Sequence, residues 1–188
     1  MSTWAEREAR RIQKAVALIS PGISTPGGVW ADVGCGDGIF TLALHSLTRP
    51  GTEIYAIDKD RDALDALMRH AAESIPDAVI HPLHADFTHQ LALTALDGML
   101  MANALHFTQA QTAVLRQLVA LLKPGGRLIV VEYNTLRAHS AVPYPLDERS
   151  FLALTGAVGL RDARIVARIP SSFLSEMYAG LATRPILP

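Results

Sequence analysis

The chain has 188 residues, of which 49% are hydrophobic and 19% charged, and this size and apolar content predict one domain spanning residues 1–188 with a substantial core. The formal net charge of −1 argues against a nucleic-acid partner, which usually requires an extended positive surface. One cysteine leaves no internal disulfide framework, and we see neither an apolar run that could span a bilayer nor a signal-like N-terminus, so we expect a cytoplasmic protein without a membrane partner.

Residues 4–19 carry apolar side chains at helical spacing opposite charged positions, which predicts an amphipathic helix that lies on the domain. The basic cluster of the chain falls in this helix, at Arg7, Arg10, Arg11 and Lys14. A solvated helix face is the common explanation of such a run. We expect the helix to serve as a partial lid over a pocket.

After this helix, strands and helices alternate along the chain. Short apolar runs predict buried strands at residues 29–33, 53–58, 78–85, 98–102 and 127–133. Helical periodicity predicts helices from residue 39 to about 49, over 60–74, and from a capping-box pattern at 108–111 as far as Leu122. Pro82 indicates that the third strand lies at an edge or is irregular, because proline cannot donate to a ladder.

The pattern changes after Tyr133. Residues 134–147 hold two prolines and no clear period, which predicts a loop, and a short helix is expected over 148–155. Two strands, at 163–169 and 173–183, are joined by a link too short for a crossover helix and should be antiparallel. The predicted fold is therefore α/β, a doubly wound sheet with helices on both faces and an antiparallel C-terminal end.

The turn between the first strand and the next helix is rich in glycine, with Gly34, Gly36 and Gly38 at alternate positions. Glycine permits positive φ and lets a ligand lie against the main chain, while the new helix presents unpaired N–H groups. A nucleotide-like ligand could bind there. The competing interpretation is steric, since a tight strand-to-helix turn can require glycine without any ligand.

Polar residues also stand where the next strands end. Asp58 follows the second strand, Asp86 and Phe87 follow the third, and Asn103 follows the fourth. In an open α/β sheet ligands bind beyond the carboxyl ends of the strands, where Asp58 can accept from ribose hydroxyls and Asp86-Phe87 suits an adenine amino group and ring. Each residue taken singly could instead cap a helix or sit in a turn.

These residues resemble the class I S-adenosylmethionine-dependent methyltransferases over residues 29–133, with DVGCGDG as the cofactor loop and LKPGGRLIVVE as the lead-in to the fifth strand. The resemblance implies a Rossmann-like seven-stranded sheet in the order 3-2-1-4-5-7-6, and S-adenosylmethionine as cofactor, with S-adenosylhomocysteine as product. It also implies a set of cofactor-binding residues. They are Asp32, Gly34, Cys35, Gly36, Gly38, Asp58, Lys59, Asp86, Phe87, Asn103 and Ala104.

Two related classes fit less well. The dinucleotide-binding dehydrogenase fingerprint requires Gly or Ala where this chain has Ile39. Methylases of base amino groups carry Pro-Pro-aromatic after the Asp or Asn that ends strand four, whereas Asn103 is followed by Ala104, Leu105 and His106. The Asn-Ala-Leu-His form resembles the small-molecule branch of the family, and it implies a small organic acceptor.

For the chemistry, His106 is the candidate general base, because an imidazole accepts a proton near neutral pH; a histidine that only shapes the helix entry is the competing interpretation. The polar candidates for substrate contact come from the end of strand five and the loop after it: Tyr133, Arg137, His139 and Tyr144. No metal site is expected, because the carboxylates and histidines lack ligand spacing. A catalytically silent partner or regulatory protein that binds the cofactor is the alternative function, and the sequence leaves a homodimer open.

Overall fold

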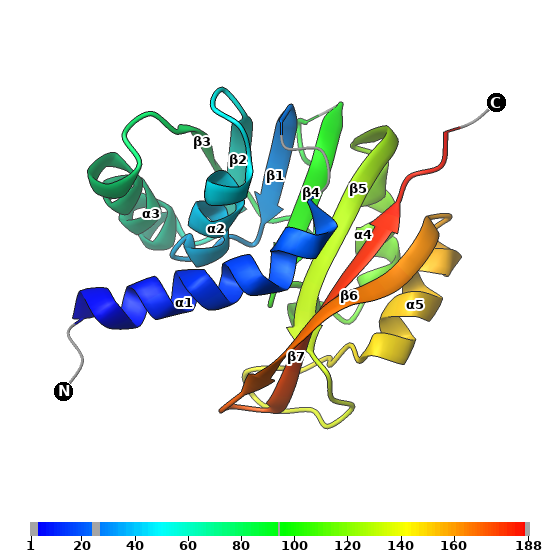
Figure 1. Ribbon diagram of the computed structural model, residues 1–188. Helices are drawn as coiled ribbons and strands as arrows, with labels where there is room; N and C mark the ends of the chain where they lie inside the picture. The colour runs from blue at the N-terminus through cyan, green and yellow to red at the C-terminus, as the bar shows by residue number, and fades with distance from the viewer. Residues whose placement is uncertain (1–3, 24–26, 94, 187–188) are drawn as a thin grey trace.

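The computed structural model describes residues 4–23, 27–93 and 95–186, and Figure 1 shows its helices and strands around one twisted sheet. The helices are α1 (Trp4–Ile19), α2 (Ile39–Leu47), α3 (Arg61–Ser74), α4 (Gln111–Val119) and α5 (Glu148–Ala157), with short 3-10 turns η1 (Ser20–Gly22) and η2 (Leu105–Phe107). The strands are β1 (Val29–Val33), β2 (Glu53–Asp58), β3 (Val79–His84), β4 (Leu96–Ala102), β5 (Leu122–Tyr133), β6 (Arg161–Ser171) and β7 (Ser175–Thr183).

The seven strands lie in the order β3-β2-β1-β4-β5-β7-β6, which confirms the order implied by the resemblance. β1 pairs in parallel with both β2 and β4, and β7 runs antiparallel to β5 and β6. β3 is an edge strand, as Pro82 predicts, and pairs with β2 alone among the described strands. Since β1 and β4 are neighbours whose connections leave in opposite directions, the switch in strand order falls between them.

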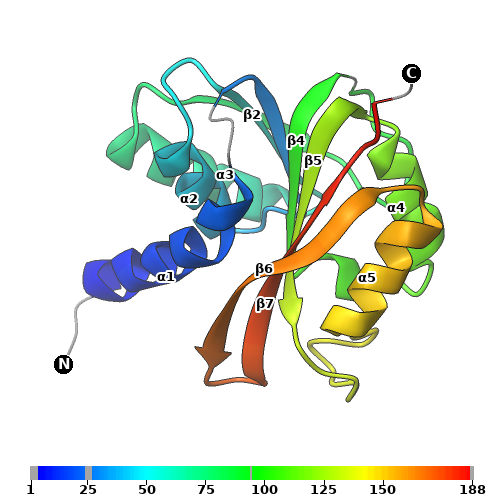
Figure 2. The same cartoon turned by 45° about the vertical axis from the view of Figure 1, so that its right-hand side comes forward.

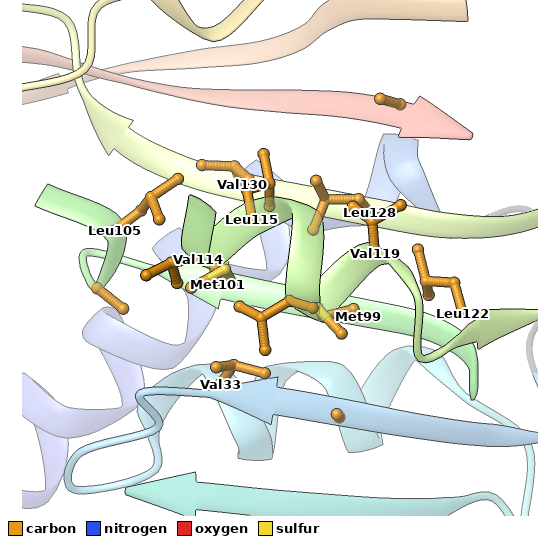
Figure 3. Close-up of a cluster of buried hydrophobic side chains, with 14 of the residues drawn as sticks. Val33, Met99, Met101, Leu105, Val114, Leu115, Val119, Leu122, Leu128 and Val130 are labelled. Carbon is orange, nitrogen blue, oxygen red and sulfur yellow. The ribbon is translucent and has the colours of Figure 1, made fainter. Parts of the chain in front are cut away.

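Helices cover both faces of the sheet: α1, α2 and α3 lie on one side, and α4 and α5 on the other (Figures 1 and 2). Two apolar layers result. One packs Trp30, Ile54 and Leu100 against α1 and α2, and the other packs residues such as Val33, Met99 and Val130 against α4 (Figure 3). The rigid sheet between these layers positions the strand ends that form the site.

The structure corrects the predicted helix over 108–122. Helix α4 begins at Gln111 after Ala110, with no side-chain capping bond; the Thr108 hydroxyl accepts from the Ala110 N–H, and the Gln111 amide donates to the carbonyl oxygens of Leu105 and Tyr144 instead. Leu122 belongs to β5 and pairs with Leu96. The next pair is Gly98 with Arg127, so residues 123–126 bulge out of the ladder. These residues therefore do more than end the preceding helix.

Other boundaries move by a few residues. β4 begins at Leu96, two residues before the predicted start, and β6 runs through Pro170 and Ser171, which the sequence assigned to a link. The alternation of strands and helices also fails once, because the described part of the connection from β3 to β4 holds no helix. Leu91 and Leu93 from this connection join the apolar layer under α4, which secures it without helical structure.

Candidate functional site

A cavity of about 640 Å³ opens at the carboxyl end of the parallel strands, within the size range of small-molecule sites. In Figure 1, α1 and the turn between β6 and β7 lie at the end of the sheet to which the β1 and β5 arrowheads point, and Figure 2 shows the same for β5. The cavity walls come from the glycine turn, the ends of β2 to β5, α1 and the β6–β7 hairpin. Side chains that are far apart in the chain therefore share one hollow.

The glycine turn lies under this cavity. The two explanations for its glycines, a ligand close to the main chain or a purely steric requirement, apply at different positions of the turn. Gly34, Gly36 and Gly38 all have positive φ, at 77°, 52° and 86°. A Cβ on Gly34 would come within 2.6 Å of the Ala104 Cβ, and one on Gly38 would overlap Leu67, so packing already requires glycine at both positions. A Cβ on Gly36 meets nothing within 4 Å, and Gly36 lines the cavity. Gly36 is thus the position at which a ligand can approach the bare main chain.

Asp58, at the end of β2, is fastened to the same turn. Its Oδ2 accepts from the Gly36 N–H at 2.8 Å and its Oδ1 from the Asp60 N–H at 2.9 Å. It does not cap α3, whose N-cap is Asp60. Each carboxylate oxygen has more than one lone-pair site, so Asp58, which lines the cavity beside Lys59, can still accept from a diol.

Asp86 and Phe87, after β3, line the cavity together with Thr88. Asp86 Oδ1 accepts from both the N–H and the hydroxyl of Thr88, at 2.9 and 2.7 Å. These bonds lower the pKa of Asp86 below its usual range, because they stabilise the ionised form. Asp86 therefore holds the turn and also offers Oδ2 as a hydrogen-bond acceptor toward the cavity.

Asn103, after β4, has two features that indicate a ligand contact. Its φ is +52°, uncommon for a residue with a side chain, and its Oδ1 is buried without a hydrogen-bond partner among the described residues. A buried polar atom left unpaired costs about 1–3 kcal/mol. Asn103 and Ala104 both line the cavity, where a ligand N–H could remove that cost.

Asp32 lies in β1 just before the glycine turn, and Cys35 lies within the turn. Asp32 is fully buried behind the cavity wall; its Oδ2 accepts from the Thr41 hydroxyl at 2.6 Å, and Oδ1 has no partner among the described atoms. Burial raises the pKa of Asp32 to about 7. Burial and the nearby carboxylates of Asp32 and Asp58 also raise the pKa of the Cys35 thiol, so the thiol stays protonated and unreactive although Cys35 lines the cavity.

His106 is not among the lining residues. Its Nδ1 lies 2.6 Å from Glu132 Oε2, its backbone N–H donates to Glu132 Oε1 at 3.2 Å, and the two side chains are 2% and 1% exposed. The ring packs between Phe107 and Tyr133, at centroid distances of 4.4 and 6.4 Å, and both of those residues line the cavity. The imidazole is therefore one layer behind the wall, and its partner Glu132 was not anticipated from the sequence.

Of the four predicted substrate residues, the structure brings only Tyr133 to the cavity. Arg137 and His139 lie on the exposed loop, where the His139 ring packs against Phe173 at 5.0 Å, and the Tyr144 N–H donates to the His106 carbonyl. Other parts of the cavity wall are built instead by residues from α1, η2 and the hairpin. They are Arg11, Lys14, Ala15, Leu18, Phe107, Ile169, Pro170, Ser171, Ser172 and Met177.

A signal for the α1 residues was present in the sequence. Residues 11, 14, 15 and 18 recur at helical spacing and share one face, but the basic members suggested a solvated side. Within the described parts of the chain, no group of three or more His, Cys, Asp or Glu side chains could hold a metal ion. Nor does any helix in those parts reach the length and apolarity that a bilayer crossing demands.

The sheet order, the glycine turn and the polar strand ends around one cavity define a class I S-adenosylmethionine-dependent methyltransferase fold and site. The family described as "Methyltransferase domain" matches residues 31–128, and the chain belongs to this family.

The chain is also similar to individual proteins. The chain is 31% identical over 163 residues to pyochelin synthetase PchE of Pseudomonas aeruginosa, covering 86% of this chain and 10% of that protein. It is 35% identical over 105 residues to an uncharacterized methyltransferase of Mycobacterium tuberculosis, covering 55% of this chain and 50% of the relative. A crystal structure of a methyltransferase from Aquifex aeolicus superposes with a TM-score of 0.70 at 14% identity, covering 97% of this chain and 99% of that one. The chain thus spans at most about half the length of these two curated relatives.

Proposed function

We propose that this protein transfers a methyl group from S-adenosylmethionine to a small organic acceptor. The observation that carries the proposal is the convergence of Gly36, Asp58, Asp86 and Asn103, from four successive strand ends, on one cavity. Bound S-adenosylmethionine would supply a methyl group already activated on a sulfonium, so the protein mainly has to orient the acceptor and exclude water.

The residues present fit the adenosyl cofactor. The open space above Gly36 admits a ligand against the main chain, and Asp58 offers acceptor oxygens for ribose hydroxyls. Asp86 and Phe87 offer an acceptor and a ring for adenine, and the unpaired Oδ1 of Asn103 suits a ligand ammonium or N–H group. Gly34, Cys35, Lys59 and Ala104 complete the wall, whereas Asp32 and Gly38 support it from behind.

His106 is the proposed general base. Nδ1–H donates a hydrogen bond to Glu132, and in the neutral imidazole this tautomer leaves Nε2 without a proton, able to take one from an acceptor O–H, N–H or C–H group. The imidazole is buried and contacts Phe107 and Tyr133, two residues that line the cavity, so the acceptor would have to approach Nε2 past those rings. The Glu132 contacts give His106 a fixed orientation, and its burial separates it from the cavity surface.

The burial of His106 also favours the second candidate, a protein that binds the cofactor without catalysing transfer. If His106 only secures η2 to β5, the cavity still holds the cofactor. The small-molecule acceptor is supported by the size of the cavity, about 640 Å³, and by the net charge of −1, which offers no extended basic surface for nucleic acid.

Two measurements test the proposal in sequence. Calorimetric titration with S-adenosylhomocysteine and S-adenosylmethionine should show saturable binding, and no binding of either would refute both candidate functions. Incubation with methyl-labelled cofactor and a fractionated extract of small metabolites should then move label into an acceptor. Binding without any label transfer would favour the silent protein.

A further inference from the structure

Charge is distributed unevenly around the cavity. Three acidic residues line the cavity, and all three lie in the glycine turn or at the ends of β2 and β3, as Asp37, Asp58 and Asp86. The remaining walls, formed by α1, η2, the ends of β4 and β5 and the hairpin, contain no carboxylate among the lining residues. A positive charge on those walls therefore has no carboxylate within the same walls with which to pair.

Two cations enter from α1. Arg11 is already paired: its Nη2 lies 3.0 Å from Asp37 Oδ2, which also ties α1 to the glycine turn. Lys14, one turn further along the same face of α1, has no ion-pair partner among the described residues. The Lys14 ammonium is therefore an uncompensated positive charge at the cavity.

The other polar groups nearby can also donate hydrogen bonds. The Ser171 hydroxyl already accepts from the Phe173 N–H and keeps its own proton for donation, and the Ser172 hydroxyl lines the same wall. Burial and Glu132 raise the pKa of the Tyr133 hydroxyl, which therefore stays protonated. Apart from Asn103, whose unpaired Oδ1 is an acceptor, these groups are donors, and together with one free ammonium they are complementary to an anion.

Between these donors the lining is apolar. Ala15, Leu18, Phe107, Ile169 and Met177 come from four different elements and line the space with aliphatic and aromatic groups. Such a lining selects a hydrophobic body, and a few polar groups orient it. One free ammonium balances a single negative charge, which favours a carboxylate over a doubly charged phosphate.

We infer that Lys14 binds a carboxylate in this cavity, and that the acceptor is an apolar or aromatic carboxylic acid. The inference rests on the proposed function, since it names the acceptor class for that site. A carboxylate can also come from the methionyl part of the cofactor, so the test separates the two sources.

The test uses the full chain saturated with S-adenosylhomocysteine and follows binding of benzoate, cinnamate and decanoate, each beside its alcohol: benzyl alcohol, cinnamyl alcohol and decanol. At least one acid should bind more tightly than its alcohol, and Lys14→Met should weaken that acid about tenfold while leaving the alcohol unchanged. Arg10→Met removes the same charge from an exposed position of α1 outside the cavity lining and should change neither.

A second arm measures S-adenosylhomocysteine and methylthioadenosine, which lacks the amino-acid carboxylate, on the wild type and on Lys14→Met. If Lys14→Met weakens only S-adenosylhomocysteine, the carboxylate belongs to the cofactor, and the acceptor assignment is overturned. If no acid is preferred and Lys14→Met changes no affinity, the whole inference is wrong although the proposed function stands. Failure of the wild type to bind S-adenosylhomocysteine would instead defeat the proposed function itself.

Discussion

His106 and Glu132 form a buried pair in which one carboxylate receives both the imidazole Nδ1 and the backbone N–H of the same residue. The pair joins the turn after β4 to the end of β5, next to two rings of the cavity wall. Removing one partner of a buried pair leaves the other uncompensated, which typically costs about 3–5 kcal/mol. The pair therefore affects stability as well as any role in catalysis, and experiments have to separate the two.

The first prediction concerns catalysis by this pair. His106→Gln should lower kcat by about 10²–10⁴-fold, because the general base is lost, while the Kd for S-adenosylhomocysteine stays near the wild-type value. Glu132→Gln keeps the acceptor for the backbone N–H but loses the charge that orients the ring, so it should lower kcat and shift the pH–rate profile. Methyl-transfer kinetics and calorimetry on folded variants provide the comparison.

His81 provides a matched control for these variants. It also pairs with a glutamate, with Nε2 lying 3.1 Å from Glu53 Oε2, but it sits on β3 and does not line the cavity. His81→Gln should leave kcat unchanged. Wild-type kcat in His106→Gln would show that His106 has only a structural role.

The second prediction concerns Asp58 as a ribose ligand. Asp58→Ala should weaken S-adenosylhomocysteine by about 1–3 kcal/mol, because the hydrogen bonds to the diol are lost. The same truncation also removes the acceptor for the Gly36 N–H, so an analogue with a dideoxyribose is needed to complete a double-mutant cycle. In calorimetry, Asp58→Ala should bind the dideoxy analogue almost as tightly as the wild type binds it.

Asp65 is the control for this truncation, since it is exposed on α3 and lies outside the cavity lining. Asp65→Ala should bind S-adenosylhomocysteine as the wild type does. Equal losses for the cofactor product and for its dideoxy analogue would remove Asp58 from direct ribose contact.

The third prediction separates the glycines of the turn. Gly36→Ala adds a Cβ into open space at a φ of +52°, so the unfolding free energy should fall by only about 1–2 kcal/mol while binding of S-adenosylhomocysteine weakens at least tenfold. Gly38→Ala meets Leu67 and should instead destabilise the fold, by the strain at positive φ plus about 1–3 kcal/mol of overpacking.

Urea unfolding and calorimetry on the two glycine variants decide this point. If Gly36→Ala binds S-adenosylhomocysteine with wild-type affinity, no ligand lies close against the main chain at that position.

The fourth prediction follows from the pKa of Asp32, about 7 in the folded chain against 3.8 in the unfolded one. Between these values the folded state retains a proton that the unfolded state has lost, so the free energy of unfolding should decrease as the pH rises from about 4 to about 7 and then level off. Three pH units correspond to an upper value of about 4 kcal/mol.

Asp32→Asn removes the titration but keeps an oxygen for the Thr41 hydroxyl. Urea unfolding at about pH 5 and about pH 8 should show a smaller loss of stability for the variant than for the wild type, and a more stable variant at the higher pH. Identical pH dependences would mean that Asp32 is ionised in the folded protein throughout this range.

The sequence determined the strands, their order through the family resemblance, and the set of strand-end residues, because hydrophobic period and turn glycines act over short stretches of chain. Local patterns were insufficient at the start of α4, where Gln111 bonds to the carbonyls of Leu105 and Tyr144 rather than entering a capping box. Tyr144 lies 33 residues after Gln111, so no short sequence pattern around residue 111 could predict this hydrogen bond.

Only the tertiary structure decided which side chains of α1 and of the β6–β7 hairpin line the cavity. Strand ends of a parallel sheet meet at one edge by geometry, so Gly36, Asp58, Asp86 and Asn103 could be grouped in advance. Lys14 and Met177 meet there because α1 and the β6–β7 hairpin fold back over that edge, while Arg137 and His139 stay outside on their loop. Such contacts depend on how whole elements pack across the domain, and spacing along the chain does not encode them.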